Sequence, residues 1–215
     1  MIDWKKRWQQ NQIGWHRLNF NQRMIDNLPN LNLNKGDSIF VPLCGKSLDM
    51  IYLANSGFKV IGVELSDTAV KDFFAENNLA YKIYKVDSFV VYKSDNITIY
   101  QGDIFNFKQE YLQNITAIYD RASLVALSPQ LRERYGKLFD GIIISGVSYL
   151  LLVLSYEQEK IDGPPFSVDE NEIKNIFNNW EITQLASFND IKHEAKFSNQ
   201  GLTILNKESY ILRKK

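Results

Sequence analysis

The feature that most constrains the fold of this chain is a series of short, nearly continuous apolar runs that alternate with helix-like segments. The first three runs cover residues 38–41, 60–63 and 97–100 and are rich in β-branched residues. Their lack of strict polar alternation is typical of strands that are covered on both faces. The sequence therefore predicts an α/β protein with a doubly wound, mainly parallel sheet.

Helix signals lie between and after these runs. Ser47 is placed to cap a helix that continues through Ala54, and Gly57 is placed to stop it. Ser66 or Asp67 is placed to start a second helix. Further along we expect helices over residues 129–139 and 168–177, a loop over 162–165, and strands over 117–119, 142–154, 182–186 and 208–212. The final strand is expected to be antiparallel and to lie at an edge of the sheet.

Length and charge limit the organisation and the partners of the chain. With 215 residues, 45% of them hydrophobic, the chain can bury one sizeable core. We therefore expect residues 1–215 to form a single domain, with residues 1–35 as a helical cover. Lys plus Arg and Asp plus Glu both number 25, which argues against a nucleic-acid partner. His16 and His193 have no metal-ligand or triad spacing, so we expect neither histidine catalysis nor a bound metal.

Cysteine use and hydropathy bear on location. Cys44 is the only cysteine, which excludes an internal disulfide and fits a reducing compartment. Without a nearby His or Asn pattern, Cys44 is better interpreted as a small turn residue than as a nucleophile. The most apolar stretch, residues 142–154, is shorter than the roughly 18 residues that suggest a membrane span. We expect a cytoplasmic protein that neither crosses nor binds a membrane.

Candidate ligand contacts begin in the turn after the first predicted strand, Val41-Pro42-Leu43-Cys44-Gly45-Lys46-Ser47. Its Gly-Lys-Ser ending is typical of a phosphate loop, but the required glycine five positions before Gly45 is replaced by Phe40. The Gly-x-Gly-x-x-Gly spacing of dinucleotide-binding turns is also missing. What remains is a tight turn in which Gly45 permits a close approach to the backbone. An ordinary structural turn is an equally weighted alternative.

Acidic residues follow the next strands at the same predicted edge of the sheet. Glu64 ends the second strand about 20 residues after the turn, where a carboxylate can accept both hydroxyls of a ribose. A solvated glutamate at a strand end is the alternative. Asp103 follows the third strand, where it can meet an adenine amine or cap the next helical turn. The turn and the acid together favour an adenosine-containing cofactor.

Two further features complete the candidate site. Arg121, in Asp120-Arg121 after the fourth strand, can anchor a carboxylate of the cofactor or form a structural pair with an aspartate. Near the N-terminus, Trp4 and Trp8 share a helical face and Trp15 lies beyond Gly14. This aromatic arm either pads the core or forms a lid over a flat ligand.

Several motifs resemble those of the thiopurine S-methyltransferases in order and spacing over nearly the whole chain. They are Arg7-Trp8 with Ile13-Gly14-Trp15-His16, residues 41–50 around Pro42-Leu43-Cys44-Gly45-Lys46, Gly62-Val63-Glu64-Leu65-Ser66, Tyr119-Asp120-Arg121-Ala122 with Leu124-Val125-Ala126-Leu127, and Gly163-Pro164-Pro165-Phe166. The Pro-Leu-Cys-Gly-Lys block is specific to this family, because it replaces the glycine-rich loop of related methyltransferases.

The resemblance implies the class I methyltransferase fold, with a seven-stranded sheet and an N-terminal helical lid, and S-adenosyl-L-methionine as cofactor. It implies cofactor contacts at Trp8, Leu43, Glu64, Asp103, Ile104 and Arg121. Trp15 matches an aromatic position against the methyl acceptor, and Arg121 is a candidate for orienting that acceptor. Lys192 departs from the pattern, because mammalian members have arginine there, near the acceptor.

The expected activity is direct, in-line methyl transfer from S-adenosylmethionine to the sulfur of a small thiopurine-like, aromatic or heterocyclic thiol, by a monomeric enzyme. One alternative is a methyltransferase of the same fold that acts on halide, thiocyanate, or selenium and tellurium species. A nucleotide-binding oxidoreductase or regulator is an alternative of a different class, since fold does not fix function.

Overall fold

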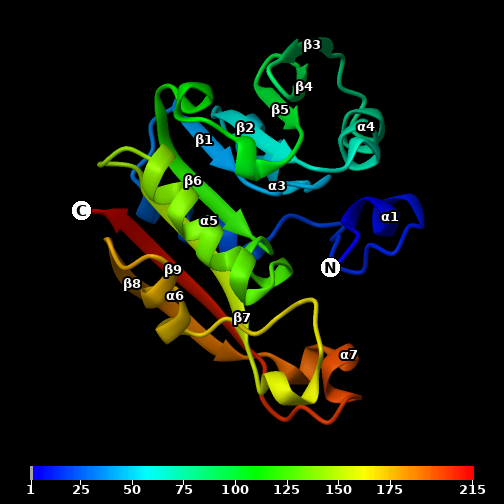
Figure 1. The fold of residues 1–215 in the computed structure, drawn as a ribbon, viewed down its shortest axis with the longest axis vertical. Coiled ribbons are helices and arrows are strands. Elements are labelled where there is room, and N and C mark those ends of the chain that lie inside the picture. Colours follow the sequence, from blue (N-terminus) through cyan, green and yellow to red (C-terminus); the bar gives the residue numbers. More distant parts are fainter. Residues whose placement is uncertain (1) are drawn as a thin grey trace.

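The computed structural model describes residues 2–215, and its sheet is built around parallel strands whose order reverses at β1 (Figure 1). Here β1 (Ser38–Val41) lies between β2 (Lys59–Glu64) and β6 (Ile115–Arg121). Beyond them, β5 (Ile97–Gln101) pairs with β2, and β7 (Ser148–Ser155) pairs with β6. All these pairs are parallel, so the predicted doubly wound sheet is confirmed. The reversal at β1 makes its carboxyl end the place where such folds bind ligands.

The sheet has nine strands in the order β3-β4-β5-β2-β1-β6-β7-β9-β8 rather than the expected seven. The two additional strands form an antiparallel hairpin of β3 (Lys82–Val86) and β4 (Phe89–Lys93) at the β5 edge. Neither strand was predicted from the sequence. β3 is almost entirely exposed and so lacks an apolar pattern, whereas β4 buries Phe89, Val91 and Tyr92 and was overlooked.

At the opposite edge, the expected antiparallel last strand is confirmed but its edge position is wrong. β9 (Asn206–Lys214) runs antiparallel to both neighbours and separates β7 from β8 (Trp180–Asn189). The largely exposed β8 takes the edge, where unpaired backbone groups can bond to water. Residues 208–212 of β9, which include the apolar Ile211 and Leu212, are buried instead.

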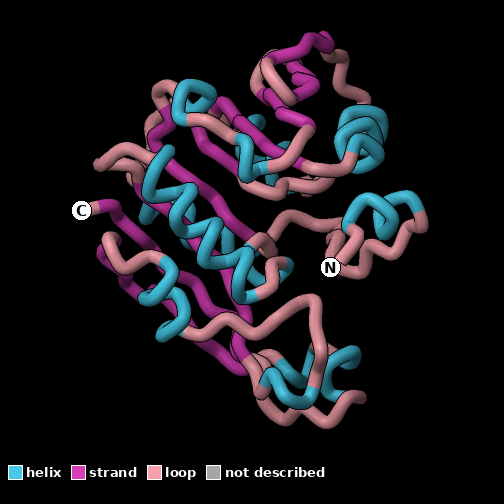
Figure 2. Tube along the Cα trace, viewed as in Figure 1, coloured by secondary structure: helices cyan, strands magenta, loops and turns pink. Residues whose placement is uncertain are grey.

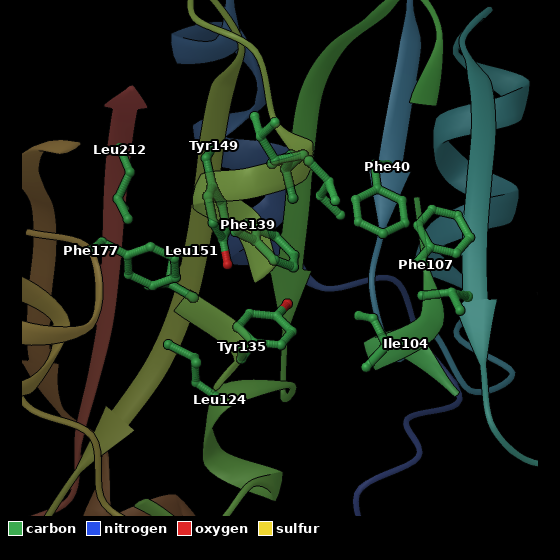
Figure 3. Packing of buried hydrophobic residues seen from close by; sticks show 14 of the residues in the cluster. Phe40, Ile104, Phe107, Leu124, Tyr135, Phe139, Tyr149, Leu151, Phe177 and Leu212 are labelled. Atoms are coloured by element: carbon green, nitrogen blue, oxygen red, sulfur yellow. The ribbon is translucent and has the colours of Figure 1, made fainter. Parts of the chain in front are cut away.

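Helices cover both faces of the sheet (Figure 2). One face carries α5 (Pro129–Ile142) and α6 (Glu170–Ile176). Tyr135 and Phe139 of α5, with Phe177 at the end of α6, pack against Phe40 and Tyr149 of the strands (Figure 3). The other face carries α2 (Gln22–Asn27), α3 (Asp49–Asn55) and α4 (Asp67–Glu76). This arrangement explains the continuous apolar runs of the central strands.

The predicted boundaries hold at most helices. Ser66 caps α4 by accepting a hydrogen bond from the Ala69 N–H at 3.3 Å, as predicted. Ser47 is not the N-cap of α3, which begins at Asp49 after Leu48, but its hydroxyl accepts the Asp49 N–H at 3.3 Å as well as a hydrogen bond from Arg121. α5 runs on to Ile142, so β7 begins at Ser148, six residues after the predicted start of the strand at 142.

The remaining helices are short. They are α1 (Trp4–Gln9), α7 (Ala195–Ser198) and 3₁₀ helices at Leu28–Leu31, Ile104–Asn106, Gln109–Leu112, Leu124–Ala126, Gln158–Lys160 and Ile191–His193. The helical character expected of the N-terminal cover is therefore found in α1, α2 and Leu28–Leu31. Within residues 2–215, no helix combines the length and the apolar character needed to cross a bilayer.

Candidate functional site

The candidate residues converge at one edge of the sheet. The arrowheads of β2, β5 and β6 in Figure 1 point toward the side on which α1 lies. The residues that follow these strands therefore meet at this edge. They are the turn after β1, Glu64 at the end of β2, residues 102–104 after β5 and Arg121 at the end of β6. The predicted ligand edge is thus a real juxtaposition of residues distant in sequence.

Glu64 is buried beneath the turn rather than solvated, so the alternative of a surface glutamate is wrong. Its Oε2 accepts the Gly45 N–H and its Oε1 accepts the Ser66 N–H, both at 2.8 Å. Burial raises the pKa of Glu64 above its ordinary value, against the opposing effect of the hydrogen bonds from Ser66 and Gly45. A carboxylate offers about four acceptor positions, so two remain for hydroxyl donors.

Trp8 of α1 lies directly on this turn. Gly45 has a φ of +54°, and a Cβ added to it would come within 3.0 Å of Trp8 Cζ2. Leu43 also has a positive φ, of +44°, so the turn is tightly folded on both sides of Cys44. Trp15 contacts Trp8 edge to face, with ring centroids 5.8 Å apart. The N-terminal arm thus places aromatic rings over the ligand edge, while Trp8 is itself buried.

Lys46 is bound within the protein and is not free for a phosphate. Its Nζ lies 2.6 Å from Glu76 Oε1 and 3.7 Å from Asp72 Oδ2, both on α4. This pairing agrees with the missing glycine of the phosphate-loop spacing. Burial, followed by the charge of Lys46, lowers the pKa of the neighbouring His16, which keeps that imidazole neutral at neutral pH.

Arg121 takes part in a buried network centred on Asp49. Its Nε donates to Asp49 Oδ2 at 3.0 Å, and its Nη2 donates to Ser47 Oγ at 3.2 Å. The same Asp49 Oδ2 accepts the Tyr119 hydroxyl at 2.9 Å, and Oδ1 accepts the Asn21 N–H at 2.8 Å. Asp49 therefore joins the N-terminal arm, by which we mean residues 2–23, to the ligand edge. Sequence reasoning missed it because an acid at the start of a helix has an ordinary local explanation.

The aspartate beside Arg121 in sequence is not its partner. Asp120 is fully buried on the other face of β6, where Oδ2 accepts the hydroxyls of Tyr135 and Tyr149, each at 2.6 Å. Because successive side chains of a strand point to opposite faces, Asp120 and Arg121 are directed apart. The structural ion pair considered for Arg121 exists, but it is formed with Asp49.

Residues 102–104 lie next to Glu64. The Gly102 N–H donates to the Glu64 carbonyl at 2.8 Å, which fixes the segment against the end of β2. Asp103 caps the following 3₁₀ helix by accepting the Phe105 N–H at 3.0 Å, so its capping alternative is confirmed. Its side chain remains exposed, while Ile104 is buried in the core.

Comparison with known proteins identifies the architecture. The family model described as thiopurine S-methyltransferase (TPMT) matches residues 2–215. A thiopurine S-methyltransferase of Pseudomonas entomophila (strain L48) is 40% identical over 97% of both chains, and one of Pseudomonas putida (strain W619) is 43% identical over 96% of both. The chain belongs to the thiopurine S-methyltransferase family. It is therefore an enzyme, a methyltransferase dependent on S-adenosylmethionine.

Solved structures agree on the fold. A SAM-dependent methyltransferase from Anabaena variabilis superposes with a TM-score of 0.69 at 16% identity, over 100% of this chain and 96% of that one. TehB from Haemophilus influenzae superposes with a TM-score of 0.61 at 16% identity, over 93% of this chain and 64% of that one. At these identities the matches show the class I methyltransferase fold alone.

Cys44 has the surroundings of a structural residue in this methyltransferase. Burial raises the pKa of the Cys44 thiol well above its ordinary value, which supports a structural role for Cys44. Its Sγ would lie only 2.8 Å from a Cβ at position 62, so the thiol fills the space that Gly62 leaves.

Within residues 2–215 no group of three or more His, Cys, Asp and Glu side chains is placed to hold a metal. Lys192 is exposed on the 3₁₀ helix Ile191–His193.

Proposed function

We propose that this edge binds S-adenosylmethionine and that the enzyme transfers its methyl group to the sulfur of a small aromatic or heterocyclic thiol, such as a thiopurine. The observation that carries the proposal is the buried Glu64 carboxylate. It is fixed by the Gly45 and Ser66 N–H groups and still has acceptor positions for a pair of hydroxyls. A ribose presents two adjacent hydroxyl donors of this kind.

The other proposed contacts surround Glu64. Gly45 and Leu43, with their positive φ angles, form a turn that a ligand can approach closely. Asp103 offers an exposed carboxylate to an adenine, and the neighbouring Ile104, which packs into the core, supplies the apolar surface beneath it. At the other end, Arg121 has nitrogen donors beyond those used by Asp49 and Ser47, and these suit the carboxylate of the amino-acid portion.

Catalysis would depend on orientation rather than on proton transfer. When bound, S-adenosylmethionine supplies a methyl carbon made electrophilic by the attached sulfonium. Aromatic thiols are largely ionised near neutral pH, so the protein need not provide a general base. Holding the reactants in line and excluding water can lower a barrier by about 7–11 kcal/mol in the best cases. Trp8 and Trp15 would exclude water from above, and Trp15 would lie against the acceptor.

Ligand binding tests the donor. S-adenosylhomocysteine should raise the melting temperature, whereas NAD and ATP should not, because their phosphate-binding turns are missing. At 100 times its Kd a ligand adds about 2.7 kcal/mol, which is readily seen as a melting shift. Stabilisation by NAD alone would contradict the proposal and would favour a nucleotide-binding oxidoreductase.

A methyl-acceptor screen with labelled S-adenosylmethionine tests the acceptor. Thiopurines and simple aromatic thiols should be methylated in preference to halide, thiocyanate, selenite and tellurite. Efficient methylation of the inorganic ions without methylation of the thiols would remove the thiol proposal while leaving the donor site intact.

A further inference from the structure

The Arg23 guanidinium of α2 is bonded to backbone carbonyl oxygens and not to a carboxylate. Its Nη1 donates to the carbonyl oxygens of Glu208, at 3.0 Å, and Val153, at 3.4 Å. No carboxylate oxygen within residues 2–215 lies within 4.0 Å of its guanidinium nitrogens, and its Nε and Nη2 donate to no group there. The side chain is only partly exposed. A half-buried guanidinium with unused donors is an unusual feature for a surface helix.

The neighbouring cations are all neutralised. Arg121 pairs with Asp49 at 3.0 Å, and Arg17 of the same arm pairs with Glu194 at 3.2 Å. Lys207 bonds to both Asp190 and Glu194. The Glu208 side chain is turned to Ser155 and Tyr210, on the opposite face of the sheet from α2. Among the described residues, Arg23 is therefore the cation of this group with no carboxylate in direct contact, although the charges of Asp190 and Glu208 act on it from a distance.

Arg23 lies next to Arg121 on the same face of the sheet. Arg121 at the end of β6 is paired in register with Leu152 of β7, and the Arg23 guanidinium binds the carbonyl of the next residue, Val153. Met24, next in sequence to Arg23, packs in the same core cluster as Tyr119 and Leu152. Asn21, two residues before Arg23, is bonded to Asp49. The arm thus carries Arg23 to the ligand edge, beside the residue proposed to hold the donor.

We propose that Arg23 binds a negatively charged group of the methyl acceptor and so makes the enzyme select anionic acceptors. This inference rests on the proposed function and deepens it. A second guanidinium, that of Arg121, and the positive sulfonium of the donor both raise the electrostatic energy of an unpaired Arg23, and an acceptor anion lowers it. The free Nε and Nη2 donors suit a carboxylate or an ionised sulfur. Arg23 is then a specificity-determining residue.

A binding experiment tests the inference without depending on turnover. The full chain, saturated with S-adenosylhomocysteine, is titrated by calorimetry with 4-mercaptobenzoate and with 4-mercaptobenzamide, which has the same thiol but lacks the carboxylate. The variants are Arg23→Gln, Arg23→Lys and, as a matched arm control, Arg17→Gln. Thermal melts establish that each variant is folded, and Arg23→Lys keeps the charge should Arg23→Gln be poorly folded.

The wild-type protein should bind the benzoate about tenfold or more tightly than the benzamide, as a charge-assisted hydrogen bond allows. Arg23→Gln should remove this preference, Arg23→Lys should keep part of it, and Arg17→Gln should leave it unchanged. Affinity for S-adenosylhomocysteine should be the same in all variants. A pH series with thiophenol then identifies the charged group. If affinity rises as the thiol ionises in wild type but not in Arg23→Gln, the contact is to sulfur, and a rise in both assigns it to the carboxylate.

The inference is overturned if Arg23→Gln changes neither the preference for benzoate nor the pH dependence with thiophenol, or if the wild-type protein binds none of these ligands. The proposed function fails in a different way. If wild type binds the benzoate through Arg23 but methylates neither thiol, the anion contact stands and the thiol acceptor is wrong.

Discussion

The ligand edge and the N-terminal arm contribute to the same site but are held in different ways. Glu64 and Gly45 are joined through backbone N–H groups, at the ends of strands that are buried on both faces. The arm is attached by separate contacts, namely Trp8 on Gly45, Asn21 on Asp49, and Arg17 on Glu194. The first region is fixed by the fold, whereas the second depends on a few side chains. Changes in the arm should therefore affect activity more than stability, and changes under the turn should affect both.

The largest expected effect is loss of turnover on deleting residues 1–16. The truncated protein should fold, because Met24 and the first strand are retained, but without Trp8 and Trp15 the edge is open to water. Circular dichroism and a methyl-transfer assay measure the two consequences. A truncated protein that does not fold would make the arm part of the core, and one that keeps full activity would show that the arm is no lid.

Asp49→Ala should be the most destabilising point substitution among those considered. It leaves the buried Arg121 without its carboxylate and the Asn21 N–H without its acceptor, and removing one partner of a buried pair costs about 3–5 kcal/mol. Urea denaturation measures the change. Asp67→Ala is the control, because its pair with Lys71 is half exposed and worth about 0–1 kcal/mol. Equal losses for the two variants would mean that Asp49 is not a structural link.

Glu64→Gln should weaken S-adenosylhomocysteine binding by tenfold or more, since a charge-assisted hydrogen bond contributes about 1.5–3 kcal/mol. The amide can also accept only at its oxygen, so one of the N–H groups of Gly45 and Ser66 loses its acceptor. Calorimetric titration of a folded variant measures the affinity. An unchanged Kd would remove Glu64 from the cofactor site.

The pH dependence of the same binding sharpens this result. Burial raises the pKa of Glu64, and ribose hydroxyls donate to the ionised form, so affinity should be full above that pKa and should fall as the pH is lowered through it. Without ligand the sign is reversed, because a raised folded-state pKa favours folding at low pH and that contribution is lost as the pH rises through it. Glu64→Gln should abolish the acid loss of affinity. If the variant loses affinity in acid as wild type does, another group titrates.

The smallest effect is expected for Cys44→Ser, which should retain most activity because Cys44 is buried and burial raises its thiol pKa, both unfavourable for a nucleophile. Cys44→Leu is the contrasting variant, since Cys44 already fills the space beside Gly62 and overpacking costs about 1–3 kcal/mol. Activity and melting temperature of both variants give the comparison. An inactive but well-folded Cys44→Ser protein would reverse the interpretation.

The contrast between locally determined and tertiary contacts also explains which features the sequence could predict. The strands 38–41, 60–63 and 97–100 and the position of Glu64 follow from local apolar runs and from a spacing along one β-α-β unit. β3 is almost entirely exposed and therefore has no apolar pattern, and the place of β9 depends on pairing between distant segments. The partners of Arg121 and the unpaired state of Arg23 likewise depend on tertiary contacts that no spacing encodes.

The position of β9 between β7 and β8 also has a consequence for how the chain folds during synthesis. β8 leaves the ribosome before β9 but has no partner in the sheet until β9 is available, because β9 supplies the only strand pairing of β8 within the described residues. Until then, the edge of β7 is open and apolar. Late in translation the nascent protein therefore exposes the unpaired edge of β7. Ribosomes that stop before residue 206 would release a product that is prone to aggregate.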